Sequence, residues 1–164
     1  MPDPSRDYLT LLLDRYWFAP PVALWRAIEL RTLAREQFPR PILDLGCGDG
    51  LIAQVLFQGD DPIEMGFDPW LDQVRKAPQT HAYDHVQQAL GNAMPYAGET
   101  FGSLFSNSVL EHIQDLEPVL AEAARVVRPG GRLLFTVPSD AFRRLLWGYR
   151  DRAGVGDGAG AEAY

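Results

Sequence analysis

Two aspartates and three glycines stand close together in the first third of the chain. Asp44 lies inside a short apolar run, Gly46, Gly48 and Gly50 alternate after it, and Asp49 lies within the glycine run. Glycine tolerates positive φ and leaves the main chain bare, so a ligand can approach the backbone closely. The N–H groups at the start of the helix expected directly afterwards favour a negatively charged group. The sequence therefore predicts a ligand-binding loop between a buried strand and a helix.

The two carboxylates indicate which kind of ligand suits this loop. They would repel a diphosphate, because two unit charges about 4 Å apart are worth roughly 4 kcal/mol at an effective dielectric of about 20. A zwitterionic amino acid group fits better, since its carboxylate can meet backbone N–H groups and its ammonium can meet an acid. The spacing also departs from the dinucleotide fingerprint, because Leu51 stands where the third glycine is expected. A nucleotide-linked oxidoreductase on a similar fold is therefore the weaker alternative.

A third acid follows a second predicted strand. Ile63, Met65 and Phe67 occupy alternate positions, which indicates a strand, and Asp68 comes directly after them. An acid at this distance from the glycine loop can accept hydrogen bonds from ribose hydroxyls. Trp70 offers a flat face for a purine beside that acid, although an aromatic residue packed in the core explains it equally well.

Three more blocks follow in the order of a known family. They run over Gly91–Tyr96, Phe101–His112 and Ala124–Leu133, after the blocks Leu43–Gly50 and Gly66–Asp68. Any one of them is common, but the ordered set is specific. Together the five blocks resemble the class I S-adenosylmethionine-dependent methyltransferases, in the broad type 11 methyltransferase-domain group.

The resemblance implies which residues bind the cofactor. Asp44 and the glycines would hold the methionine part of S-adenosylmethionine, and Asp68 would bind the ribose. Asn92 stands where an acid is usual, and its carbonyl oxygen can still accept a hydrogen bond from the adenine amino group. The full implied set is Asp44, Gly46, Cys47, Gly48, Asp68, Pro69, Trp70, Asn92, Ala93, Met94, Ser106 and Asn107.

The reaction implied by the resemblance is methyl transfer to a small acceptor molecule, and the aromatic and leucine-rich flanks of the chain indicate an apolar one. The cofactor supplies the electrophile and the protein supplies placement. His112 is the candidate general base, which is needed only if the acceptor keeps its proton; a structural or cofactor-side role is preferred for it. Tyr8, Tyr16 and Trp17 are candidates for a lid over the acceptor, although packing of the first helix is preferred. A non-catalytic S-adenosylmethionine-binding subunit is the alternative from another functional class.

Composition limits the partners and the location. The 164 residues are 46% hydrophobic and carry a formal net charge of −7, which argues against a broad nucleic-acid or anionic-membrane surface. The single cysteine, Cys47, excludes an internal disulfide framework, and with no histidine nearby it is a poor nucleophile candidate. His81, Asp84 and His85 have metal-ligand spacing only if helical, so loop histidines and no metal are expected. No signal peptide or spanning segment is evident, so a cytoplasmic location is expected.

The elements that must position these residues form three zones. Residues 1–40 are expected to be an N-terminal helical segment with a break at Pro20 and Pro21, after which Leu24, Ala27, Ile28, Leu30 and Leu33 recur near helical spacing. Residues 41–138 alternate strands and helices, which predicts an α/β fold with a Rossmann-like, doubly wound parallel sheet. Within this zone we expect a helix over Leu116–Val127, with Asp115 as its N-cap and a Pro-Gly-Gly turn at its end, and the fifth strand over Leu133–Val137.

Residues 139–164 are expected to begin a cap or substrate-covering region. Four apolar residues form a stripe there, and arginines from Arg143 to Arg152 form a basic patch that suits a solvated face or weak contact with a membrane surface. No candidates for the family's two further strands are present, which leaves an open edge at the fifth strand. The sequence is therefore expected to be a fragment, truncated after the fifth strand. Completion of the sheet in a homodimer and a minimal domain are the alternatives.

Overall fold

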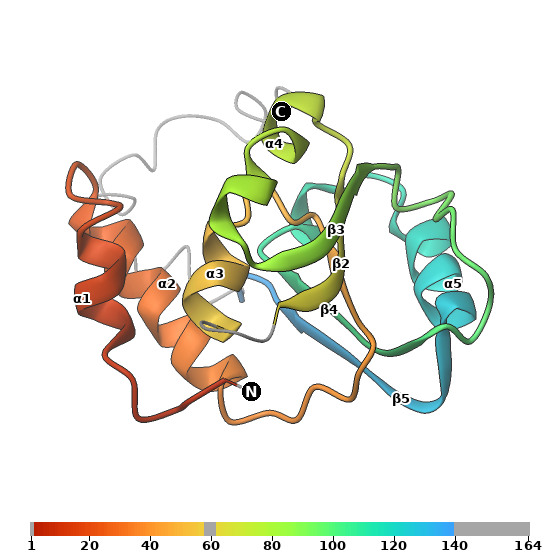
Figure 1. The fold of residues 1–164 in the computed structure, drawn as a ribbon, viewed down its shortest axis with the longest axis horizontal. Coiled ribbons are helices and arrows are strands. Elements are labelled where there is room, and N and C mark those ends of the chain that lie inside the picture. Colours follow the sequence, from red (N-terminus) through yellow and green to blue (C-terminus); the bar gives the residue numbers. More distant parts are fainter. Residues whose placement is uncertain (1, 58–61, 140–164) are drawn as a thin grey trace, which may run out of the picture.

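Five parallel strands form the sheet that carries the predicted ligand-binding residues (Figure 1). The computed structural model of the chain describes residues 2–57 and 62–139. The strand order is β3-β2-β1-β4-β5, so the winding direction reverses at β1, between β2 and β4. Open α/β sheets bind ligands beyond the carboxyl ends of the strands at such a reversal. The predicted doubly wound, Rossmann-like sheet is confirmed. Its strands are β1 (Ile42–Leu45), β2 (Ile63–Asp68), β3 (Tyr83–Gln88), β4 (Phe101–Asn107) and β5 (Val127–Thr136).

The helices cover both faces of this sheet. Figure 1 shows α1, α2 and α3 on one side and α5 on the other. The expected break at the proline pair is confirmed, because α1 ends at Leu13 and α2 begins at Pro20; proline suits the first turn, where no intrahelical donor is needed. The α-helices are α1 (Tyr8–Leu13), α2 (Pro20–Leu33), α3 (Leu51–Phe57), α4 (Leu71–Val74) and α5 (Leu116–Val126), and the 3₁₀ helices are η1 (Ala77–Thr80) and η2 (Leu110–His112).

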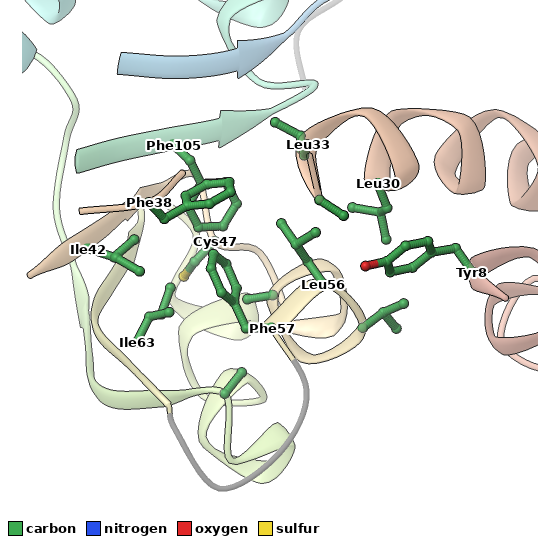
Figure 2. Close-up of a cluster of buried hydrophobic side chains, with 14 of the residues drawn as sticks. Tyr8, Leu30, Leu33, Phe38, Ile42, Cys47, Leu56, Phe57, Ile63 and Phe105 are labelled. Carbon is green, nitrogen blue, oxygen red and sulfur yellow. The ribbon is translucent and has the colours of Figure 1, made fainter. Parts of the chain in front are cut away.

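Alternating strand residues divide the apolar side chains into two cores, as both faces of a parallel sheet are covered. Ile42 of β1 packs with α1, α2 and α3, whereas Leu43 packs with α5. Figure 2 shows the first of these cores, in which the rings of Phe38, Phe57 and Phe105 pack against one another, with centroids 5.1 to 5.9 Å apart. β1 and β4 are packed between these two cores. The glycine loop follows β1, and the last residues of the Phe101–His112 block follow β4.

The start of the fifth strand differs from the expectation. β5 begins at Val127, directly after α5, rather than at Leu133. The proline and glycines of the expected turn lie inside the strand, where the pairing with β4 shifts register between Phe101 and Ser103. Gly130 adopts a φ of 77° there. The turn residues therefore end the helix but produce an irregularity in the strand instead of a separate loop.

Two further expectations change. His85 lies in β3 and not in a loop, because this mostly polar segment pairs with β2. Leu24 and Ile28 of α2, expected among the residues that recur at helical spacing, are exposed, whereas Ala27 and Leu30 are buried. The predicted helix is confirmed, but its buried face is formed by Ala23, Ala27, Leu30 and Leu33.

The remaining structural expectations concern what is absent or lies elsewhere. The expected apolar stripe and basic patch after residue 139 lie outside the described residues. Over residues 2–57 and 62–139, no helix combines the length and the apolar character that a membrane crossing requires. The same residues contain no group of three histidine, cysteine or acidic side chains placed to hold a metal ion.

Candidate functional site

The glycine loop adopts the backbone that its sequence predicts. Gly46, Gly48 and Gly50 have φ values of 76°, 53° and 83°, which residues other than glycine rarely adopt. The N–H groups of Gly46 and Cys47 donate to the carbonyl of Phe67 at 2.9 and 3.0 Å, so the loop is fixed to the end of β2. A Cβ at Gly48 would meet no atom within 4 Å. The loop therefore offers bare backbone with open space beside it.

Asp68 joins the loop to the next strand. One carboxylate oxygen accepts from the Gly48 N–H at 3.0 Å, and the other accepts from the Trp70 N–H at 2.8 Å. The residue is 6% exposed, and it lies at the carboxyl end of β2. Each carboxylate oxygen has capacity for more than one donor. Asp68 can therefore keep both main-chain bonds and still accept from the hydroxyls of a ribose.

A cavity of about 570 Å³ opens beside the loop and Asp68. Its size falls within the range of about 300–1,000 Å³ that is typical of small-molecule sites. Trp70 is 58% exposed, so the interpretation of this ring as a core aromatic is wrong. Six of the predicted site residues line the cavity: Gly46, Asp68, Pro69, Trp70, Asn92 and His112.

Asp44 lies behind the loop rather than on the cavity wall. Its side chain is 3% exposed and accepts a hydrogen bond of 2.6 Å from the hydroxyl of Tyr83, on β3. Burial raises the pKa of this carboxyl from 3.8 to about 7, although the Tyr83 bond opposes that shift. Asp44 is not among the residues that line the cavity, so its role as a cofactor ligand stays a prediction.

Six other predicted residues are not among those that line the cavity. Burial raises the pKa of the Cys47 thiol, which agrees with its poor prospects as a nucleophile. Met94 is buried in the core beside α5, and its N–H donates to Glu122 at 2.8 Å. The Ser106 hydroxyl donates to the carbonyl of Leu45 at 3.0 Å. Gly48, Ala93 and Asn107 are likewise not lining residues. Cofactor contacts by Cys47, Gly48, Ala93, Met94, Ser106 and Asn107 therefore stay predictions.

Sequence reasoning missed several residues of the cavity wall. Asp115 was expected only as the N-cap of α5, and it occupies that position without a side-chain capping bond. Asp115 is one of the residues that line the cavity. The cavity is also lined by Leu45, Phe67, Leu90, Gly91, Val109, Ile113 and Val119. These apolar residues gave no chemical signal in the sequence, although four of them lie inside the five blocks and two lie directly beside a block.

The three lid candidates have different environments. Tyr8 is fully buried and donates to the carbonyl of Asp3 at 2.8 Å, so it packs the first helix as preferred. Trp17 is 76% exposed, and its ring meets Phe18 edge-on at 5.9 Å. Burial raises the pKa of the Tyr16 hydroxyl, while Arg26 nearby opposes that shift. An exposed aromatic pair thus lies next to the start of α2.

A larger hollow lies elsewhere, between α5 and β5. It has a volume of about 860 Å³, and Leu120, Arg125 and Leu133 are among its lining residues. None of the predicted ligand-binding residues lines it. Volume alone therefore does not locate the site; the smaller cavity combines the glycine loop, two carboxylates and an amide at the point where the sheet reverses.

Comparison with known proteins gives the family. Residues 43–135 match the family model described as a methyltransferase domain. The human mitochondrial ubiquinone biosynthesis O-methyltransferase is 30% identical over 120 residues, which are 65% of this chain and 32% of that protein. The malonyl-[acyl-carrier protein] O-methyltransferase of Pseudescherichia vulneris is 34% identical over 102 residues, 62% of this chain and 40% of that protein. The chain thus spans well under half the length of these relatives.

Solved structures show the same fold at lower identity. An S-adenosylmethionine-dependent methyltransferase from Thermotoga maritima has a TM-score of 0.58 at 19% identity, covering 75% of this chain and 59% of that one. One from Mesorhizobium loti has a TM-score of 0.55 at 21% identity, covering 68% and 53%. With the family match, the strand order and the glycine loop, the chain belongs to the methyltransferase-domain family and has the Rossmann-like fold of the class I S-adenosylmethionine-dependent methyltransferases.

Proposed function

We propose that the protein binds S-adenosylmethionine in the cavity beside the glycine loop and transfers its methyl group to a small acceptor. The observation that carries the proposal is the position of Asp68. Its nearly buried carboxylate lies on the cavity wall and is tied to the backbone of the glycine loop at Gly48. This is the arrangement that the family resemblance requires of a ribose-binding acid.

The chain's own residues supply binding and placement. Asp68 accepts from the ribose hydroxyls, the Asn92 carbonyl oxygen accepts from the adenine amino group, and the exposed ring of Trp70 covers the purine. When bound, the cofactor supplies a methyl group on a positively charged sulfur. Holding an acceptor in line with that group can contribute roughly 7–11 kcal/mol through proximity alone. His112 lies on the same wall, and we assign it a cofactor-side role rather than that of a general base.

The acceptor is proposed to be small and apolar, with oxygen as the methylated atom. Two relatives are named as O-methyltransferases, one of them in ubiquinone biosynthesis. The exposed Trp17 and Phe18 give this chain an apolar surface at the start of α2. These features support an apolar acceptor that approaches from the side of α1 and α2.

The proposal also covers location and partners. With a formal net charge of −7, the protein repels polyanions, so we do not expect a nucleic-acid partner. A cytoplasmic location and a possible homodimer remain part of the same proposal, as does weak contact with a membrane surface.

Titration of the purified chain with S-adenosylhomocysteine, and separately with NAD, tests the cofactor assignment. Isothermal calorimetry should show binding of S-adenosylhomocysteine and none of NAD at the same concentration. Binding of NAD alone would overturn the proposal. Release of S-adenosylhomocysteine from S-adenosylmethionine in the presence of candidate phenols then separates a catalyst from a cofactor-binding subunit, which would bind without turnover.

A further inference from the structure

A cluster of polar side chains links α2 to the end of β4, on the opposite side of the loop from Asp68. Glu29 of α2 is 9% exposed, and it accepts from Arg26 at 2.8 Å, from Asn107 at 3.2 Å and from the Ser108 hydroxyl at 3.0 Å. Arg26 also donates to the Ser108 hydroxyl oxygen. We name these four residues the α2–β4 cluster. Each of its two β4-side residues is thus bonded to the same carboxylate.

Ser108 has a backbone that its residue type disfavours. Its φ is 52°, in the left-handed region, where a residue with a Cβ is disfavoured because the Cβ crowds the following carbonyl oxygen. Its N–H donates to the carbonyl of Thr136 at 3.0 Å, so the main chain is held on β5. Strained residues of this kind persist where the surroundings over-determine them. Here the surroundings are the hydroxyl's bonds to Arg26 and Glu29.

The strained residue sets the position of the cavity wall. Val109 follows Ser108 and packs so closely on the loop that a Cβ at Gly46 would lie 2.5 Å from one of its methyl groups. Val109 lines the cavity, and its carbonyl accepts from the N–H of His112, which lines it as well. The conformation of Ser108 therefore determines where this part of the wall meets the glycine loop.

We infer that Arg26 and Glu29 are positioning residues for the cofactor site, acting through Ser108. Their bonds to its hydroxyl offset the cost of the left-handed backbone and hold Val109 against Gly46. Both residues lie in α2, outside the residues 43–135 that match the family model. This inference rests on the proposed function, because it assigns the N-terminal helix a part in binding the same cofactor.

A plain structural tie between α2 and the sheet is the competing explanation. The chain contains such a tie: Glu36, just after α2, pairs with Arg132 of β5 at 2.7 Å. It attaches the helix to the same sheet without touching Ser108. If these contacts served only to anchor α2, substitutions at Glu29 and at Glu36 should therefore have the same effect on cofactor binding.

Two substitutions at Ser108 separate these explanations. Ser108→Ala and Ser108→Gly remove the same hydroxyl, but only alanine keeps the Cβ that makes the left-handed backbone costly. We expect the alanine variant to bind S-adenosylhomocysteine at least fivefold more weakly than the wild type, and the glycine variant to stay within about twofold of it. A purely structural hydroxyl predicts the opposite order, because glycine adds chain entropy to the same loss.

A double-mutant cycle extends the test to α2. Glu29→Gln keeps the size of the side chain but turns an N–H₂ group toward donors that the carboxylate accepts. It should weaken S-adenosylhomocysteine binding several-fold alone, and by less than twofold in the S108G background. The matched control Glu36→Gln should leave the affinity unchanged in both backgrounds.

Thermal unfolding of each variant shows that the compared proteins are folded. Equal affinities for the two Ser108 variants, or equal effects of Glu29→Gln in both backgrounds, would overturn the inference. Failure of the wild type to bind S-adenosylhomocysteine would instead overturn the proposed function, so the two failures are distinguishable.

Discussion

Asp68 is placed so that ligand binding and loop geometry depend on one side chain. Its carboxylate accepts main-chain N–H groups on both sides, from Gly48 and Trp70, while it lies on the cavity wall. A ligand that donates two hydroxyl groups would meet an acceptor already held in place. The Asp68 side chain therefore loses little conformational freedom when the ligand binds, which favours affinity.

Replacement of Asp68 by alanine should weaken binding of S-adenosylhomocysteine by roughly 1.5–3 kcal/mol, the usual contribution of hydrogen bonds to a charged group. Calorimetric titration measures the change. Asp72→Ala serves as the matched control, because that carboxylate follows closely in the chain and its side chain is 88% exposed. An affinity equal to that of the wild type would show that the ribose does not bind at Asp68.

The sequence predicts some residues of the site well and others not at all. Asp68, Trp70 and Asn92 have recognisable types at recognisable positions, and all three line the cavity. The environment of Asp44 was not predictable, because Tyr83 lies 39 residues away along the chain. Their contact exists only because β3 lies beside β2 and β2 beside β1. A local pattern contains no information about such a lateral arrangement.

Among the elements, the central strands were the easiest to predict and the edge strands the hardest. β1 is buried at every position and reads as an apolar run. β3 is largely polar and half-exposed because it borders the sheet, so it shows no apolar periodicity. β5 contains the turn residues Pro129 and Gly130 within its length. Turn signals predict where a helix ends, but the pairing with β4 decides where the next strand begins.

Gly102 of β4 should be needed for the strand to pass its neighbour. A Cβ there would lie 2.6 Å from the main-chain oxygens of Pro39 and Arg40, and backbone atoms cannot give way cheaply. We expect Gly102→Ala to lower the free energy of unfolding by about 1–3 kcal/mol, measured by urea denaturation. Gly98→Ala is the control, since its nearest contact would be 3.3 Å. Equal effects of the two substitutions would contradict this account of the strand's packing.

For the molecule as a whole, the buried Asp44 makes stability depend on pH. Its pKa is raised by burial to about 7 in the folded protein, from 3.8. Between these values the folded state binds more protons than the unfolded state, so the free energy of unfolding decreases as the pH rises. The limiting slope for one such group is about 1.4 kcal/mol per pH unit.

Urea denaturation of the wild type and of Asp44→Asn at pH 5, 6 and 7 tests this dependence. The asparagine side chain does not titrate, so the stability of the variant relative to the wild type should increase as the pH rises across this window. Well below pH 3.8 the relative stability should become constant, because the carboxyl is then protonated in both states. A difference that stays the same at every pH would show that Asp44 titrates normally.

The hydrogen bond between Tyr83 and Asp44 has a consequence for local motion. A strand at the border of a sheet ordinarily frays, and its amide protons exchange with solvent faster than those of the centre. Detachment of β3 would remove the Tyr83 hydroxyl, which donates at 2.6 Å to the carboxylate of Asp44. That carboxylate would then be left buried in the middle of the sheet without this donor. That penalty couples the border to the interior, so β3 and β1 should open together, and their amides should exchange at similar rates.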